Sequence, residues 1–194
     1  MNVAVLLFGG FDELDAVAPY EVFETAGDFG ASVTAEFVTL DAATSIEAAH
    51  GMRIEPDGVL ADADPGLLVV PGGGWNDRSS PGVWTEYERS AIPDAVAEKH
   101  ADGTTVASVC TGAMLLAKAG LLDGRPATTH HTALDDLRET DASVRETRFI
   151  DDGDVLTAAG ITSGFDLALH LVEREFGEEV ADDVARELEY ERTV

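Results

Sequence analysis

Short apolar runs alternate with stretches of helical spacing along this chain. The candidate strands are apolar or rich in β-branched residues, and they are Val3–Phe8, Ser32–Leu40, Leu67–Val70, Thr104–Val109 and Ala127–His130. The candidate helices repeat apolar residues every three to four positions, over Leu14–Thr25, Ser80–His100, Thr111–Ala119, Ala133–Glu139, Thr162–Phe176 and Glu178–Tyr190. Continuous apolar strands that alternate with helices predict an α/β fold: a mostly parallel sheet with helices on both faces.

Prolines and glycines mark the expected breaks. Pro19 lies inside the first helical pattern, so we expect that helix to begin or kink there, and Pro93 predicts a second interruption. Turn residues predict one hairpin over Thr44–Pro56 and a second formed by Val144–Ile150 and Val155–Ala158. They also predict a loop or short helical turn over Gly58–Ala63. No repeat or linker divides the sequence, so we expect one domain over residues 1–194.

The charge is strongly one-sided, with 38 acidic residues against 12 basic ones and a net charge of −26. The acids are spread along the chain, and the apolar periodicity is intact, which argues against a disordered acidic protein. We interpret this as an acidic surface adapted to a salt-rich cytoplasm, where ions screen self-repulsion. A surface that binds a partner is the alternative. Nucleic-acid binding is disfavoured because it needs clustered Lys and Arg.

The N-terminal segment reads as a strand and lacks the basic start of a signal peptide. No apolar stretch reaches the length of a transmembrane helix. We therefore expect a cytoplasmic protein that does not insert into a membrane. A single cysteine excludes an internal disulfide and a metal site built from several cysteines.

That cysteine, Cys110, stands at an abrupt change from strand to helix. The β-prone run Thr104–Val109 precedes it, and Thr111-Gly112-Ala113 opens an apolar helix after it. A thiol at the start of a helix has N–H groups and a positive dipole nearby, so we expect a reactive thiolate. A free cysteine that is only a small buried hydrophobe is the alternative interpretation.

Asp15 is the acid best placed to work with this thiol. It follows the strand-end pair Gly9-Gly10 and lies among apolar residues, so burial would raise its pKa and suit it to proton transfer. Its alternative role is that of an acid favoured by the helix dipole. The neighbours Asp12 and Glu13 are expected to be solvated.

Two further segments end predicted strands and belong to the same expected cleft, because ligands bind beyond the carboxyl ends of parallel strands. Gly72 and Gly73 let a backbone approach a ligand closely and offer N–H groups to an oxyanion, although a simple turn explains them as well. His130 or His131 is a candidate base, or a structural histidine.

These residues carry a resemblance to the ThiJ/PfpI superfamily, whose members have the class I glutamine amidotransferase-like fold. The matching segments follow the family order over nearly the whole chain, and they are Val70–Gly73, Val109–Gly112, Gly124–His130 and Thr157–Leu169. The resemblance implies a flavodoxin-like sandwich with a nucleophile elbow at Cys110. Within the superfamily, the segment Leu14–Phe23 together with Cys110-Thr111-Gly112 resembles the isonitrile hydratase branch most.

That branch implies a lyase without metal or organic cofactor, which adds water to an isocyanide to give an N-substituted formamide. Cys110 would be the nucleophile and Asp15 the acid, while Gly72, Gly73, Thr111 and His130 would bind substrate or oxyanion. A homodimer is expected from the same resemblance. Thr111 replaces the histidine that follows the cysteine in the protease-like branch, which argues against a peptidase.

Other functions within the family compete with the hydratase. Glutamine hydrolysis is disfavoured because His170 and Glu173 have the wrong spacing and lie in a predicted helix. We do not expect an AraC-type regulator, because the sequence ends at Val194 without the length of a DNA-binding domain. A glyoxalase or deglycase acting on reactive carbonyls, and a redox-sensing or ligand-binding module that uses Cys110, stay open as alternatives.

Overall fold

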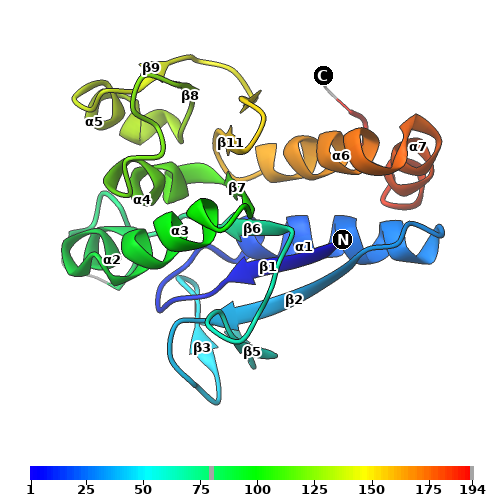
Figure 1. The fold of residues 1–194 in the computed structure, drawn as a ribbon, viewed down its shortest axis with the longest axis horizontal. Helices are drawn as coiled ribbons and strands as arrows, with labels where there is room; N and C mark the ends of the chain where they lie inside the picture. The colour runs from blue at the N-terminus through cyan, green and yellow to red at the C-terminus, as the bar shows by residue number, and fades with distance from the viewer. Residues whose placement is uncertain (79–80, 193–194) are drawn as a thin grey trace.

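The structure is a computed structural model that describes residues 1–78 and 81–192. Its main sheet has seven strands in the order β10-β11-β7-β6-β1-β2-β5 (Figure 1). They are Asn2–Leu6 (β1), Thr34–Thr39 (β2), Gly58–Val59 (β5), Leu67–Val70 (β6), Thr105–Ser108 (β7), Phe149–Asp151 (β10) and Val155–Ala158 (β11). Within this sheet, as the described residues form it, β10 and β11 are the one antiparallel pair, so the predicted mostly parallel sheet is confirmed.

Two groups of helices cover this sheet (Figure 1). The helices are Glu13–Asp28 (α1), Val83–Arg89 (α2), Ala91–Ala101 (α3), Ala113–Lys118 (α4), Leu134–Arg138 (α5), Ser163–Phe176 (α6) and Glu178–Glu187 (α7). Helix α1 packs against α6 and α7, whereas α2, α3 and α4 pack together. Right-handed crossovers explain the two groups, because β1 connects toward β2 and β6 connects in the opposite direction toward β7.

This reversal of direction between neighbouring strands places the site. The chain leaves β1 and β6 toward opposite edges of the sheet, so a crevice opens beyond their carboxyl ends, where α/β folds bind ligands. Strand β7 lies directly beside β6. The segments that follow β1, β6 and β7 therefore meet at one edge, as the sequence predicted.

The central strands are buried on both faces, which explains their continuous apolar sequences. Every residue of β6 and β11 is buried, and so are four of five in β1. The large side chains least exposed to solvent include Phe11, Phe23, Leu68, Met114, Leu115 and Leu156. Burial of this apolar surface is the main favourable contribution to folding.

Two small sheets lie outside the main one. Ile46–Glu47 (β3) and Arg53–Ile54 (β4) pair antiparallel, and this confirms the first predicted hairpin. Pro126–Ala127 (β8) and Ser143–Val144 (β9) pair parallel, so the predicted strand that continued to His130 is wrong. The second predicted hairpin is confirmed by β10 and β11, although its first strand is shorter than expected.

Helix α1 corrects the prediction made from Pro19. The helix begins at Glu13, six residues earlier, where the Asp12 side chain accepts the N–H of Leu14 at 3.2 Å and caps the helix. Pro19 lies inside the helix and is buried. Its missing N–H would have pointed at the carbonyl of Asp15, so the cap and the packing against α6 outweigh one lost hydrogen bond.

Two further boundaries differ from the prediction. The long helical pattern breaks at Ser90, which adopts a left-handed conformation with φ of 62°, and Pro93 lies within the first turn of α3, where its missing N–H costs nothing. Ser80, where the pattern was expected to begin, lies outside the described residues. Gly58–Val59 is not a loop but a strand beside β2.

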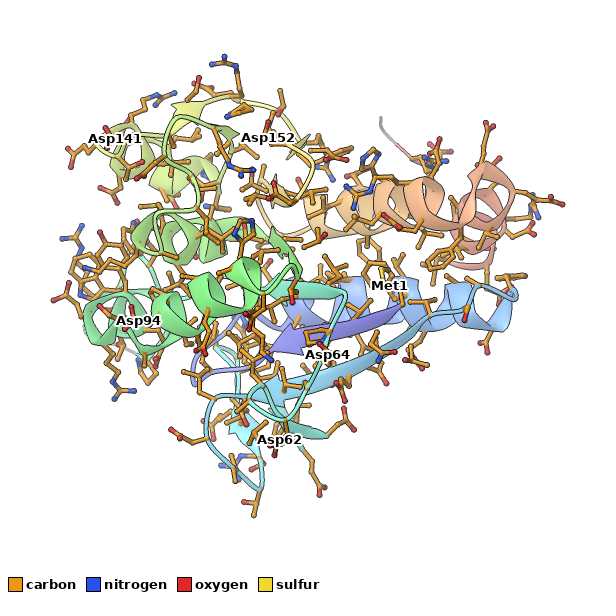
Figure 2. The ribbon with its side chains drawn as sticks, viewed as in Figure 1. Met1, Asp62, Asp64, Asp94, Asp141 and Asp152 are labelled. Carbon is orange, nitrogen blue, oxygen red and sulfur yellow. The ribbon has the colours of Figure 1, made fainter. Side chains whose placement is uncertain are left out.

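Acidic side chains occur on several separate elements. Figure 2 shows labelled aspartates on the loop between β5 and β6, on α3, and on the loops that follow α5 and β10, and the exposed ones among them are Asp62, Asp64, Asp94 and Asp141. No helix among residues 1–78 and 81–192 is both long enough and apolar enough to cross a membrane.

Candidate active site

Cys110 occupies a sharp elbow directly after β7. Its backbone φ is +58°, a left-handed conformation that costs a non-glycine residue roughly 1–3 kcal/mol. Hydrogen bonds on both sides hold the elbow: the Cys110 N–H donates to the carbonyl of Ala159 at 2.9 Å, and the Thr129 hydroxyl donates to the Cys110 carbonyl at 2.9 Å. Gly112 is required here, since a Cβ would lie 2.3 Å from the Val70 carbonyl oxygen.

Asp15 lies in the first turn of α1 and is completely buried. Its Oδ2 accepts the N–H of Gly72 at 3.0 Å, while no nitrogen or oxygen donor among the described residues reaches its Oδ1. Burial raises the pKa of Asp15 from 3.8 to about 8, and the charge of Asp12 adds to the rise, against the opposing hydrogen bonds from Gly72 and Cys110. The expected burial and raised pKa are both present, so this carboxyl is mostly protonated at neutral pH.

The Cys110 thiol is 6% exposed and does not behave as the helix start predicted. Burial raises its pKa above the ordinary value, and the neighbouring Asp15 carboxyl raises it further. The N–H groups of Ile161 and Thr111 face the sulfur and lower the pKa, but they do not outweigh burial. The expectation of a thiolate at rest is therefore wrong: a neutral thiol lies beside a neutral acid.

Gly72 and Gly73 hold Asp15 and Thr111, the two residues next to the thiol, through their backbone N–H groups. The Gly72 N–H donates to Asp15, and the Gly73 N–H donates to the Thr111 hydroxyl oxygen at 3.0 Å. A Cβ on Gly72 would lie 2.5 Å from the Thr111 nitrogen and 2.9 Å from Asp15 Oδ2, so only glycine fits between them. Either N–H would meet a substrate oxyanion only by exchanging its present hydrogen bond.

His130 lies at the wall of the site, over the backbone of Gly160. A Cβ on Gly160 would approach the ring to 2.6 Å at Cδ2 and 3.2 Å at Nε2. The Thr132 N–H donates to Nδ1 at 3.3 Å, so the proton of the neutral ring belongs on Nε2. Burial lowers the pKa of His130, and the adjacent His131, whose ring centroid is 4.2 Å away, lowers it further.

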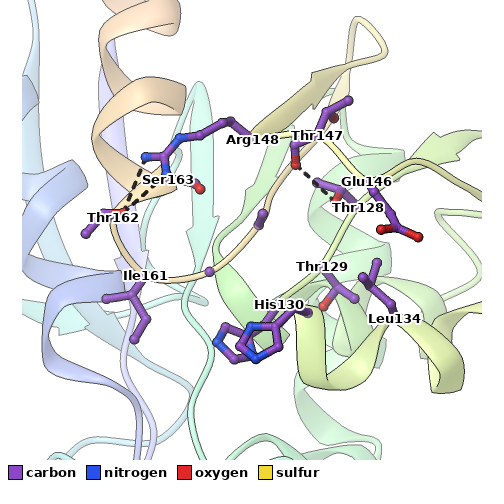
Figure 3. A pocket seen from close by; sticks show the side chains of 13 residues that line it. Thr128, Thr129, His130, Leu134, Glu146, Thr147, Arg148, Ile161, Thr162 and Ser163 are labelled. Atoms are coloured by element: carbon purple, nitrogen blue, oxygen red, sulfur yellow. Dashed lines mark hydrogen bonds between the residues drawn. The ribbon is translucent and has the colours of Figure 1, made fainter. Parts of the chain in front are cut away.

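A cavity of about 550 Å³ lies between the segments 128–131, 146–148 and 159–163 (Figure 3), and Cys110, Asp15, Gly72 and Gly73 are not among the residues that line it. Its wall includes Ile161, whose N–H faces the Cys110 sulfur, and Thr129, whose hydroxyl holds the Cys110 carbonyl. Both candidate bases, His130 and His131, lie on this wall.

Sequence reasoning missed Ile161 and Arg148. An isoleucine in a loop gives no chemical signal, because its contribution is a backbone N–H. The one available sign was its place directly after Gly160, at the carboxyl end of a predicted strand. Arg148 lay inside a predicted strand and was therefore not considered for the site.

One group of side chains in the described part of the chain has the composition of a metal site. Asp12, Glu13 and His50 place potential ligand atoms within 4.8 Å of one another. The Glu13 carboxylate is already engaged, since it accepts the His50 N–H and contacts His50 Nδ1, each at 2.7 Å. This pairing accounts for the cluster without a metal ion.

Comparisons with known proteins agree with this fold. The model of the DJ-1/PfpI family matches residues 1–174. Isonitrile hydratase from Pseudomonas putida is 32% identical over 98% of this chain and 78% of its own length. The HTH-type transcriptional regulator CdhR from Pseudomonas aeruginosa is 31% identical over 94% of this chain, which spans about half (53%) of that regulator. The crystal structure of a ThiJ/PfpI family protein from Pseudomonas syringae is 25% identical, with a TM-score of 0.87 over 98% of this chain and 75% of that one.

Proposed function

The chain belongs to the DJ-1/PfpI family, and from that premise we propose that it is a cofactor-free lyase that adds water to an isocyanide to give an N-substituted formamide. One observation carries the proposal: Asp15 is fully buried beside the thiol of Cys110, which raises its pKa to about 8, and no nitrogen or oxygen donor among the described residues reaches its Oδ1. The 32% identity with isonitrile hydratase supports the same reaction.

A neutral pair suits this substrate. The terminal carbon of an isocyanide accepts a nucleophile and then needs a proton on the same carbon. Asp15 donates its proton to that carbon as the Cys110 sulfur attacks, and the carboxylate formed takes up the thiol proton. The thiol S–H is thereby added across the carbon, which gives a covalent thioimidate, and Asp15 is protonated again.

The second half of the reaction releases the product. Water adds to the thioimidate carbon, and the nitrogen receives a proton. His130, kept neutral by its lowered pKa, lies on the cavity wall, where its Nε2–H can donate a hydrogen bond that orients this water. Collapse of the tetrahedral carbon breaks the carbon–sulfur bond, releases the formamide and returns the thiol. The N–H groups of Thr111 and Ile161 stabilise the negative charge that develops on sulfur.

The same pair supports a second candidate, a glyoxalase or deglycase activity on reactive carbonyls. There the sulfur would attack the carbonyl carbon, and Asp15 would protonate the oxygen. Redox sensing by Cys110 has less support, because oxidation needs an accessible thiolate, whereas this thiol is 6% exposed with a raised pKa.

Formamide production from a panel of alkyl and aryl isocyanides tests the proposal, with methylglyoxal as the competing substrate. Cys110→Ala and Asp15→Asn are expected to abolish isocyanide turnover. Asp28→Asn, which changes an exposed acid at the far end of the same helix, is the matched control and is expected to leave turnover unchanged. Turnover of methylglyoxal without turnover of any isocyanide would replace the first candidate with the second.

A further inference from the structure

The segment 159–162, which follows β11, carries a strained residue against the nucleophile. Ile161 has φ of +32°, a conformation that is rare for a β-branched residue. Its N–H faces the Cys110 sulfur, and the neighbouring Ala159 carbonyl accepts the Cys110 N–H at 2.9 Å. Strained backbone persists only where the surroundings hold it in place, so something must fix this turn.

Arg148, which also lines the cavity, holds the turn through its guanidinium group (Figure 3). Both terminal guanidinium nitrogens donate to the Thr162 hydroxyl at 3.4 Å, and Nε donates to Asp166 Oδ2 at 2.7 Å. The Arg148 carbonyl also accepts the N–H of Ala159 at 2.8 Å. One residue therefore contacts the segment at both of its ends, through its backbone at residue 159 and its side chain at residue 162.

The partner of Arg148 shows that this is more than a surface ion pair. The Asp166 side chain is completely buried, whereas exposed pairs typically contribute little to stability. A buried carboxylate needs a charged partner and further donors, and the Tyr190 hydroxyl supplies one more at 3.1 Å. The guanidinium is thus fixed in one geometry by a carboxylate at the start of α6.

We propose that Arg148 is a positioning residue for the reaction: by binding Thr162 and Asp166 together, it holds the 159–162 turn so that the Ile161 N–H stays against the Cys110 sulfur. Arg148 touches neither sulfur nor substrate in this role. The inference deepens the proposed function, on which its catalytic meaning rests, but the placement of the N–H is testable without any isocyanide.

Alkylation of Cys110 by iodoacetamide between pH 7 and 10 reports the fraction of thiolate directly, since Cys110 is the only cysteine. Arg148→Met is expected to raise the thiol pKa by about one unit and to slow alkylation about tenfold at fixed pH. Thr162→Val removes only the hydroxyl that Arg148 binds, and it is expected to slow alkylation in the same direction. Isocyanide turnover is measured on the same proteins.

Two variants separate positioning from other effects. Arg148→Lys keeps the charge but cannot hold both partners with a planar fork, so it is expected to resemble Arg148→Met. Arg174→Met removes a comparable arginine on α6 that pairs with Asp151 at 3.2 Å, and it is expected to alkylate like the unchanged protein. Circular dichroism melting confirms that each variant is folded.

Alkylation at the unchanged rate in Thr162→Val and Arg148→Lys would overturn the inference, because charge alone would then explain Arg148. Slowed alkylation in Arg174→Met to the same extent would overturn it too. If the unchanged protein turns over no isocyanide, the proposed function fails, while the alkylation profiles still decide the role of Arg148.

Discussion

Asp15→Asn is expected to make the protein more stable at neutral and alkaline pH while it removes activity. Asn has nearly the same shape as Asp, and its side-chain oxygen can still accept the Gly72 N–H that Asp15 accepts at 3.0 Å. What changes is the titratable proton. In the folded protein Asp15 has a pKa of about 8, compared with 3.8 for an ordinary aspartate, so the folded state holds this proton far more tightly than the unfolded chain does.

The sign of the effect follows from that difference. Well below pH 4 the Asp15 carboxyl is protonated in the folded and in the unfolded state, so it does not reduce the free energy of unfolding. As the pH rises from about 4 to about 8, the unfolded chain gains a solvated carboxylate, while the folded state keeps the acid neutral, so stability is lost progressively. At about 1.4 kcal/mol for each pKa unit, the loss approaches about 6 kcal/mol above pH 8.

Urea unfolding of the unchanged protein and Asp15→Asn at several pH values in one concentrated salt solution measures this directly. The difference in unfolding free energy between the two is expected to grow by several kcal/mol from pH 4 to pH 8 and then to level off. Comparing the two proteins cancels the titration of the other acids. A difference that stays flat over this range would refute the raised pKa, and with it the neutral acid on which the mechanism depends.

Three further outcomes follow from the sequence and the site. Gly160→Ala places a Cβ 2.6 Å from the His130 ring and should displace it, lowering turnover about tenfold while the melting temperature falls by only a few degrees. Transfer from 2 M to 0.1 M KCl should destabilise the protein in urea unfolding, because a net charge of −26 is then poorly screened; indifference to salt would contradict a halophilic surface. Size-exclusion chromatography in concentrated salt should give about twice the chain mass of 20.5 kDa, and a monomer would contradict the expected homodimer.

The sequence predicted most of the fold because buried parallel strands leave a distinctive pattern. Leu67–Val70 and Thr104–Val109 are apolar or β-branched, so neither suited a surface loop, and the glycines after them marked where the strands stop. The start of α1 was predicted wrongly because the hydrogen bond that Pro19 removes can be inferred from the sequence. The Asp12 cap and the packing of α1 on α6, which compensate for it, are seen only in the structure.

Residue type and position in the sequence predicted that Cys110 and Asp15 lie close together, and the structure places them side by side. Their catalytic roles stay predictions. The protonation state of the Cys110 thiol could not be predicted from the sequence, because its pKa depends on burial and on the neighbouring Asp15. Together these two raise the pKa more than the N–H groups of the short helix start lower it. Ile161 was missed because its N–H is its contribution, and only the three-dimensional turn shows where that group lies.

In the proposed reaction Cys110 and Asp15 act together as a neutral thiol and acid on an isocyanide carbon. Single-turnover detection of the cysteine thioimidate, by intact-protein mass spectrometry after mixing with an isocyanide, tests this most directly. We expect an adduct on the unchanged protein that decays to formamide, and no adduct on Cys110→Ala or Asp15→Asn. Formamide release by Cys110→Ala, or absence of both adduct and formamide with every isocyanide tested, would contradict it.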